Sequence, residues 1–439
     1  MSLETPDKIR TLQRKLYVKA KAEPEFRFYL LHDKICRPDI LAYAFVLARH
    51  NDGSAGVDGV TFDDIERAGV EARLEALRED LASMTYQPMP VRRVMIPKPG
   101  GGERPLGIPT IRDRVAQTAA KLVLEPIFEA AFEDCAYGYR PKRSAGDAIK
   151  ATHRLIRRGY ADVVDADLSK YFDSIPHAEL LKSAARRIVD AKVLRLIKLW
   201  LASPVEERDG AGKRRMRGGK SNRKGTPQGG VISPLLANLD MNRFLKFWRL
   251  KECGKVFRAH VVNYADDFVI LSRGHADEAL AWTRAVIARL GLTINETKTS
   301  LKNARVEDFD FLGYTFGPRY GQGGNPYLGA RPSKKSLKRI KGKISDLLRP
   351  CETGTWPDVR KRLNRLTGGW SAYFNYGTLN AAHREVDRHV CDRVRRFLNR
   401  RAKRGGRGAR GFSWTDVFGK LGVQRLTRDN PAAPAVSLT

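Results

Sequence analysis

The 439 residues are 42% hydrophobic and include only 22 prolines, a composition typical of a folded protein with two to four domains. The apolar runs are short and the N-terminus lacks an apolar core, so neither a membrane span nor a secretory signal is expected. A formal net charge of +32 points to a polyanionic partner, because so much like charge destabilises a compact protein unless a nucleic acid neutralises it.

The first third of the chain is predicted to be mostly helical. A helical pattern covers residues 1–50, the turn formers of NDGSAGVDG interrupt it, and a second helical stretch covers residues 63–84. Residues 91–109 favour two short strands around a glycine turn, and a long helical pattern follows from Arg112. This part should therefore consist of helices with one hairpin between them.

The middle of the chain mixes strands with helices. An apolar run over residues 161–166 turns into a helix, and two apolar runs within residues 259–272 meet at a tight polar turn. The mixture predicts an α+β sheet domain from about Gly138 to Phe316.

The last quarter is predicted to be helical and is strongly basic. Residues 321–333 are predicted to be a linker, and helices are expected at residues 334–348, 358–377 and 383–404. In the third helix, a stripe at helical spacing is expected to face the core: Val386, Val390, Val394 and Phe397. Residues 319–439 carry 27 basic and 8 acidic residues, which predicts a dedicated nucleic-acid-binding region. The last residues, 429–439, are expected to be disordered.

Two groups of carboxylates stand where apolar strands end. Asp266 and Asp267 are adjacent in the polar turn, where they repel each other unless water or a cation screens them. Asp165 and Asp167 share one face of the earlier strand, and Asp173 belongs to the helix beyond it. A solvated Asp-Asp turn is the alternative, but two such groups in one sheet domain can hold a pair of divalent ions for an in-line transfer.

Two loops offer groups that suit a nucleotide. Lys98 and Arg104 flank the glycine turn of the predicted hairpin, where two cations can clamp a triphosphate; a solvated basic hairpin is the alternative. The GTPQGG loop combines a flexible backbone with the amide of Gln228. The GGKS segment is not a P-loop, because Arg214 stands where that motif requires glycine.

The segments YADD and DLSKYFD resemble the catalytic Y-x-D-D box and the first palm carboxylate motif of reverse transcriptases. The resemblance implies that Asp167, Asp266 and Asp267 are catalytic, and that with Leu168 they hold two Mg²⁺ ions, for which Mn²⁺ can substitute. It also implies that Phe172 is a steric gate against a ribose 2′-hydroxyl, with a core phenylalanine as the alternative. Three more roles follow from the resemblance: Lys298 near the leaving pyrophosphate, and Gln228 and Gly229 as nucleotide contacts.

Further segments resemble group II intron-encoded reverse transcriptases. NDGSAGVDGVTFDDI is similar to their N-terminal extension, FLGYTF to a segment that grips the primer, and RLTGGWSAYFNYG with the helix after it to their thumb and maturase domain. The aromatic residues of that domain, including Trp370 and Tyr373, are either core or RNA contacts. For Arg140, Lys142 and Arg143 in YGYRPKRSAGDAI, a structural role is equally compatible. The resemblance implies these RNA contacts: Arg140, Lys142, Arg143, Lys334, Lys335, Lys338, Arg393, Arg396 and Arg400.

The resemblance implies an α+β right-hand polymerase. Its expected parts are an N-terminal helical segment (1–54), fingers (55–160), a palm (161–318), a helical thumb and maturase domain (319–425) and a disordered tail (426–439). Its expected partners are structured intron RNA, an RNA template with a DNA primer, dNTPs and target DNA, with no membrane. We expect a cytoplasmic or nucleoid-associated monomer or dimer, without an H-N-H endonuclease. The alternatives are a related enzyme domesticated for host defence or repair, and a catalytically silent splicing factor.

Overall fold

The computed structural model describes residues 3–97, 102–208, 213–219, 221–321, 323–402 and 412–427. By its internal contacts the chain divides into unit 1, residues 1–144 and 166–300, and unit 2, residues 145–165 and 301–439. The mixture of helices and sheets confirms the predicted α+β class. In the part of the chain that is described, no helix is long and apolar enough to cross a membrane.

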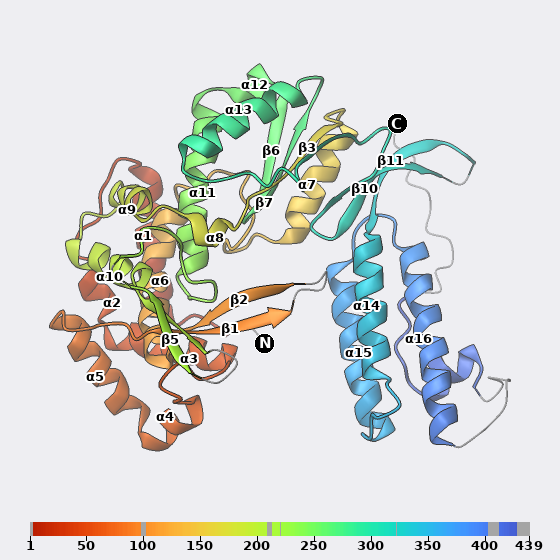
Figure 1. Ribbon diagram of the computed structural model, residues 1–439, viewed down its shortest axis with the longest axis horizontal. Helices are drawn as coiled ribbons and strands as arrows, with labels where there is room; N and C mark the ends of the chain where they lie inside the picture. The colour runs from red at the N-terminus through yellow and green to blue at the C-terminus, as the bar shows by residue number, and fades with distance from the viewer. Residues whose placement is uncertain are drawn as a thin grey trace. The chain divides into compact units, whose positions relative to one another are not determined.

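The N-terminal part of unit 1 is helical, as predicted, but it is interrupted more often than predicted. Its helices are α1 Asp7–Ala22, α2 His32–Ile35, α3 Pro38–Asn51, α4 Phe62–Ala68, α5 Val70–Ala82 and the long α6 Ile111–Glu129 (Figure 1). α3 begins with Pro38 in its first turn, where the missing N–H of proline costs nothing. Gly69, with a φ of 95°, separates α4 from α5 within the second predicted helix.

Two four-stranded sheets contain the predicted hairpins. The first has the order β2-β1-β4-β5 and is built from β1 Val91–Pro97, β2 Glu103–Ile108, β4 Pro204–Arg208 and β5 Arg214–Gly218. The second has the order β6-β7-β3-β8 and is built from β3 Asp162–Asp167, β6 Ala259–Tyr264, β7 Asp267–Ser272 and β8 Ser300–Asn303. The antiparallel pairs β1–β2 and β6–β7 confirm the strands that the apolar runs predict.

The described residues of unit 1 also include these helices: α8 Tyr171–Ser174, α9 His177–Ala185, α10 Ala191–Leu201, α11 Ser233–Leu250, α12 Cys253–Val256 and α13 Ala276–Arg289. Most residues of α6 and α11 are buried, so these two helices form much of the core of unit 1. Phe244 on α11 packs against Phe268 of β7 with ring centroids 5.5 Å apart. This contact fixes α11 against the sheet that carries the YADD turn.

Unit 2 corrects one prediction. It contains α7 Ala145–Arg157, β9 Phe309–Phe311, β10 Tyr314–Tyr320, β11 Pro326–Pro332, α14 Lys334–Leu347, α15 Trp356–Tyr373, α16 Asn380–Arg401 and the π-helical turn η1 Asp416–Lys420. The linker predicted at residues 321–333 is wrong, because β11 pairs with β10 from Tyr314–Pro332 to Tyr320–Pro326. The glycines and prolines there mark the turn of a hairpin.

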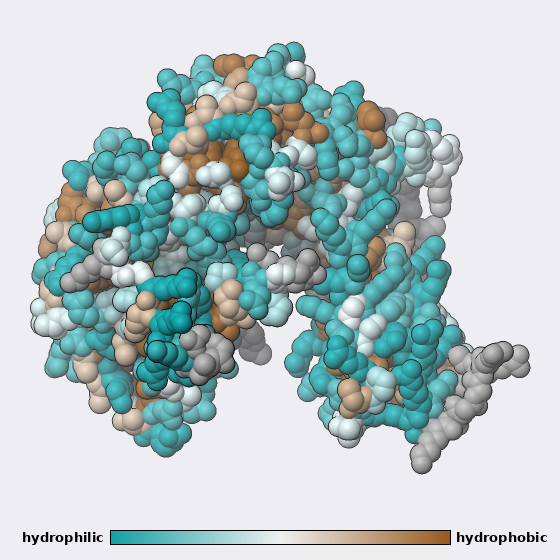
Figure 2. Space-filling model, in the orientation of Figure 1, coloured by the Kyte–Doolittle hydropathy of each residue, from teal (hydrophilic) through white to brown (hydrophobic). Residues whose placement is uncertain are grey.

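The helices α14, α15 and α16 lie side by side, and hydrophilic side chains cover most of the face that Figure 2 shows (Figures 1 and 2). The predicted stripe of α16 is confirmed as core: Val386, Val390, Val394 and Phe397 pack with buried residues of α14 and α15. Leu426 and Thr427 belong to this bundle, because their backbone N–H groups each donate to Asp387 at 2.9 Å, so the tail boundary predicted at residue 426 is wrong for them. Residues 429–439, predicted to be disordered, lie outside the described residues.

The division into units differs from the predicted domain boundaries. Residues 145–165 and 301–318, predicted to be in the fingers or the palm, belong to unit 2. On α7, His153 Nε2 donates to the Leu328 carbonyl and His153 Nδ1 bonds to the Tyr376 hydroxyl, both at 2.8 Å. These contacts join α7 to segments that lie much later in the sequence.

Candidate functional site

The YADD segment forms a tight turn at the end of the β6–β7 hairpin. Tyr264 pairs with Asp267, which leaves Ala265, at a φ of 60°, and Asp266 in the turn itself. The Asn263 side chain donates to the Ala265 carbonyl at 2.9 Å and so fixes the turn. The carboxylate of Asp266 is thereby held at one end of the sheet, with Asp267 exposed beside it.

The second carboxylate, Asp167, ends β3, the strand next to β7. Its Oδ2 accepts a hydrogen bond from Lys298 Nζ at 2.9 Å and another from Asn295 Nδ2 at 3.1 Å. The Asn295 N–H also donates to the Asp167 carbonyl at 2.8 Å, and Leu168, the next residue, forms a bridge with Ile294. The segment that carries Asn295 and Lys298 is therefore fixed against the end of β3.

The charges of these residues influence one another. Burial raises the pKa of Asp266, the negative charge of Asp167 raises it further, and Arg104 and Lys298 lower it. The hydrogen bond to Asp167 raises the pKa of Lys298, with smaller contributions from the charges of Asp267 and Asp266. The three predicted carboxylates thus share one site with a lysine that stays protonated at neutral pH.

The β1–β2 hairpin and the GTPQGG loop meet in unit 1. Arg104 Nε donates to Gln228 Oε1 at 2.9 Å, and the Gly107 N–H donates to the Gln228 carbonyl at 2.5 Å. Gly229 has a φ of 107°, and a Cβ there would overlap the Gly107 carbonyl, so only glycine allows this approach. Two predicted nucleotide contacts, Arg104 and Gln228, are thus adjacent. Lys98 lies outside the described residues.

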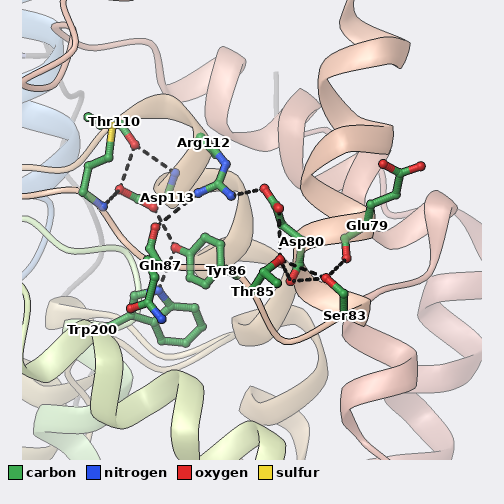
Figure 3. A network of polar contacts seen from close by, with 11 residues as sticks. Glu79, Asp80, Ser83, Thr85, Tyr86, Gln87, Thr110, Arg112, Asp113 and Trp200 are labelled. Carbon is green, nitrogen blue, oxygen red and sulfur yellow. Dashed lines mark hydrogen bonds and ion pairs between the residues drawn. The ribbon is translucent and has the colours of Figure 1, made fainter.

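A buried polar network anchors the hairpin that carries Arg104 (Figure 3). Asp113 on α6 accepts from the Met89 N–H at 3.0 Å and from Thr110 Oγ1 at 2.8 Å, so it ties the residues just before β1 to those just after β2. It also accepts from the Tyr86 hydroxyl at 2.7 Å, to which Trp200 Nε1 donates at 3.1 Å. The network fixes both ends of the hairpin to α6 and α10.

The predicted steric gate, Phe172 on α8, is 5% exposed. Its carbonyl accepts from the Thr226 N–H at 2.7 Å, which joins it to the GTPQGG loop. Its ring lies edge-on to that of Tyr139, with centroids 6.4 Å apart. The burial is compatible both with a gate at the wall of the site and with the alternative of a core phenylalanine.

Two further residues belong to the site, Tyr139 and Asn295, and no motif in the sequence singles them out. Burial raises the pKa of Tyr139, and the charge of Asp266 raises it further, so this hydroxyl shares the electrostatic environment of the carboxylates. A Cβ at Gly138 would lie 2.5 Å from the Ala265 nitrogen, so glycine lets this segment pass against the YADD turn. The only signal in the sequence was that both residues occur in segments already linked to the site, YGYRPK and LTINETK.

The predicted RNA contacts differ in exposure. Arg140 contradicts its prediction: it is buried, its guanidinium pairs with Glu129 at 2.7 Å, and it also donates to the carbonyls of Glu133 and Ala136. Lys142 is exposed, and Arg143 pairs with the exposed Asp134. In unit 2 the exposed side chains are Lys334, Lys335, Lys338, Arg396 and Arg400, whereas Arg393 is half-buried and donates to the Ser345 carbonyl.

The donor set at the carboxylate site suits a hard divalent cation. Carboxylate oxygens are the ligands that Mg²⁺ prefers, and Asp167 lies close enough to Asp266 to raise its pKa, a repulsion that a cation would relieve. Within the described ranges, no three His, Cys, Asp or Glu side chains are already grouped as ligands of one ion. The suitability of this site for Mg²⁺ therefore rests on its carboxylate oxygens and on the repulsion between Asp167 and Asp266.

Comparisons with known proteins identify the family. The family model described as reverse transcriptase (RNA-dependent DNA polymerase) matches residues 96–316, and the group II intron, maturase-specific domain matches residues 337–412. Protein YkfC of Escherichia coli K12 is 35% identical over 355 residues, which cover 72% of this chain and 90% of YkfC.

Two further similarities cover less. The group II intron-encoded protein LtrA of Lactococcus lactis subsp. cremoris is 36% identical over half of this chain, which spans 35% of LtrA. A solved structure named as a partial Cas6-RT-Cas1–Cas2 complex is 23% identical, with a TM-score of 0.36, over 59% of this chain and 42% of that chain. From the family matches and the similarity to YkfC, the chain belongs to the reverse transcriptases, RNA-directed DNA polymerases, and carries a group II intron maturase-specific domain.

Proposed function

We propose that this reverse transcriptase extends a DNA primer on an RNA template with two Mg²⁺ ions, and that it binds a structured intron RNA to assist splicing and mobility. The observation that carries the proposal is the grouping of Asp167, Asp266 and Lys298 around one site. Asp167 ends β3, and Asp266 lies in the turn of the neighbouring β6–β7 hairpin. Lys298 Nζ lies 2.9 Å from Asp167.

In the proposed mechanism, Asp167, Asp266 and Asp267, with the backbone at Leu168, would hold the ions. When bound, the two ions supply the positive charge that activates the primer hydroxyl and stabilises the pyrophosphate leaving group. Lys298, whose pKa is raised by its bond to Asp167, stays protonated and can balance charge or donate a proton near the leaving group.

The remaining residues position the nucleotide. Arg104 can bind phosphate oxygens through its guanidinium fork, and its bond to Gln228 orients both side chains. Phe172 closes the site on the sugar side and disfavours a 2′-hydroxyl. We assign the β1–β2 hairpin to the fingers, the sheet with Asp167 and Asp266 to the palm, and α14–α16 to the thumb and maturase domain that binds RNA through its exposed lysines and arginines.

Primer extension with purified full-length protein tests the proposal. Asp266→Ala with Asp267→Ala should abolish Mg²⁺-dependent extension of a DNA primer on an RNA template, while binding of that RNA is retained. The adjacent exposed pair Asp277 and Glu278, at the start of α13, gives the matched control. Their double alanine variant should extend the primer normally, and full activity of the Asp266/Asp267 variant would refute the metal assignment.

A further inference from the structure

A groove of about 820 Å³ in unit 1 is lined mainly by α11, the C-terminal end of α9 and the residues that follow α1. Of the described residues that line it, seven are basic and one, Glu25, is acidic. None of the described residues of the proposed polymerase site lines it. Its volume lies within the range of roughly 300–1,000 Å³ that is typical of ligand sites.

The groove is separate from the nucleotide loop along α11. That helix begins at Ser233, directly after the GTPQGG loop, whereas the groove residues on it run from Leu239 to Leu250. At 1.5 Å per residue, Arg243 and Arg249 lie about 15 and 24 Å along the helix axis from Ser233. A molecule in the groove would therefore bind away from the incoming nucleotide.

Three cations of the groove are paired within the protein. Lys182 pairs with Glu179 at 2.8 Å, Arg243 with Asp240 at 2.9 Å, and Arg249 with Glu133 at 3.0 Å. Because these charges are already compensated, they contribute less to the potential of the groove.

Four other cations have no acidic partner among the residues described. Arg186 is exposed and Lys246 half-buried, and neither forms an ion pair there. Arg27 donates to the Ala185 carbonyl, and the buried Arg187 donates to main-chain carbonyls, including that of Ala20 at 2.7 Å. In the described part of the chain none of these four cations forms an ion pair, and carboxylates act on them only from a longer distance, as Glu25 does on Arg187 and Glu133 on Lys246.

This arrangement has an electrostatic cost that an anion would remove. Burial lowers the pKa of Lys246, and the charges of Arg186, Arg249 and Arg187 lower it further, against the opposite effect of Glu133. Such a concentration of like charge disfavours the folded state until a polyanion binds. The lining also includes exposed apolar surface on Phe247 and Leu250, on which a base or ribose could pack.

We propose that this groove is a second RNA-binding surface, which holds the phosphodiester backbone of a structured RNA. RNA is favoured over an acidic protein because it presents phosphates together with ring faces, and because the chain carries a group II intron maturase-specific domain. The inference rests on the proposed RNA-binding function, but it assigns this binding to unit 1 in addition to the basic helices of unit 2.

Charge reversal tests the groove. Arg186→Glu with Lys246→Glu in the full chain should weaken binding of a labelled RNA hairpin by about tenfold or more at moderate salt. The slope of log affinity against log salt should decrease by about 2, because each variant side chain would no longer neutralise one phosphate. The matched control is Arg195→Glu with Lys198→Glu on α10, where both side chains are exposed, lie outside the groove and undergo the same charge change. The control should bind the hairpin like the wild type.

Two further measurements keep the test decisive. If Lys246→Glu prevents folding, Lys182→Glu with Arg186→Glu replaces it, because both of those side chains are exposed at the end of α9. Photocrosslinks from the bound hairpin should map to residues 182–187 and 239–250.

The outcomes separate this inference from the polymerase proposal. Primer extension on a short homopolymer template should be unchanged in the groove variants, whereas failure of the polymerase proposal would appear in the Asp266/Asp267 variant. Two results would overturn the RNA assignment. One is unchanged affinity of the groove variants for the RNA hairpin, and the other is a loss of affinity only for polyglutamate or for a DNA hairpin of the same sequence.

Discussion

Lys298 Nζ lies 2.9 Å from Asp167 Oδ2, although the two residues are 131 positions apart in the sequence. The lysine side chain is 64% exposed and the aspartate 21%, so the pair stands at the rim of the site and not in the core. Lys298 already balances the charge of Asp167. It can therefore also stabilise the negative charge that develops on the leaving group during phosphoryl transfer.

Replacing Lys298 should therefore affect catalysis and not folding. We expect Lys298→Ala to lower the rate of single-nucleotide incorporation at saturating dNTP by on the order of a hundredfold, within the range of general acid–base catalysis. Thermal unfolding should change little, because the side chain is largely exposed. Lys298→Arg separates the two roles: it restores the rate if only a counter-charge is needed and fails if a proton must be given up. An unchanged rate in Lys298→Ala would remove the residue from the mechanism.

Phe172 should decide the choice of sugar. Shortening it to valine should raise incorporation of NTPs relative to dNTPs by roughly ten- to a hundredfold, because the clash with a 2′-hydroxyl is relieved. Phe172→Ala would also leave a cavity and cost about 3–5 kcal/mol of stability, so valine is the better first variant. Competition between dNTPs and NTPs on one template measures the effect, and a constant ratio would favour the core role. Phe132, also buried but outside the site, serves as the control position.

Gly229→Ala should impair the nucleotide loop. A methyl group there would overlap the Gly107 carbonyl, and the φ of 107° adds strain, so the hydrogen bond between Gln228 and Arg104 should break. We expect kcat/KM for dNTPs to fall by about tenfold for each 1.4 kcal/mol by which the substitution raises the activation free energy. Gly59→Ala is the matched control, because Gly59 also has a positive φ, 72°, but has open space around it. Equal activities of the two variants would show that the close approach is not needed.

The free energy of unfolding should depend on pH through the carboxyl group of Asp113. Burial raises the pKa of its carboxyl, an effect that bonds from Tyr86 and Thr110 only partly offset. Because the folded state holds this proton more tightly than the unfolded chain, the contribution is complete below the ordinary value of 3.8 and is lost as the pH rises through the raised pKa. Asp113→Asn removes this titration.

Urea unfolding of both proteins at several pH values checks this. The free energy of unfolding of the wild type, minus that of Asp113→Asn, should fall from about pH 3.8 upward and level off above the raised pKa. A difference that rises over the same interval would reverse the sign of the shift. Arg104-dependent dNTP binding should weaken in Asp113→Asn, because its one side-chain oxygen cannot accept both the two bonds from Met89 and Thr110 and the bond from the Tyr86 hydroxyl.

Local patterns in the sequence predict the parts of this fold that depend on local contacts. The β6–β7 hairpin and the stripe of α16 follow from alternation and helical spacing, and both are confirmed. The strand β11 does not follow from the sequence, because its glycines and prolines favour a linker and local composition does not reveal its pairing with β10. The burial of Arg140 does not follow from the sequence, because local sequence does not distinguish a buried arginine from an exposed one. Its partner Glu129 lies 11 positions earlier, on α6.

In the candidate site too, the sequence does not predict the contacts between distant segments. Asp167, Asp266 and Asp267 could be chosen from their places at strand ends, but Tyr139 and Asn295 become recognisable only when the chain brings their segments against those ends. Long-range packing decides which tyrosine or asparagine meets a carboxylate.

The place of α7 also bears on how the protein is made. His153 bonds to Tyr376, which is synthesised 223 residues later. At 5–20 residues per second, the ribosome needs roughly 10 to 45 seconds to supply that partner. During this interval α7 has left the ribosome while its final neighbours are not yet translated. Unit 2 therefore cannot be completed co-translationally until nearly the whole chain exists, and a nascent chain arrested before β11 would leave α7 available to chaperones and proteases.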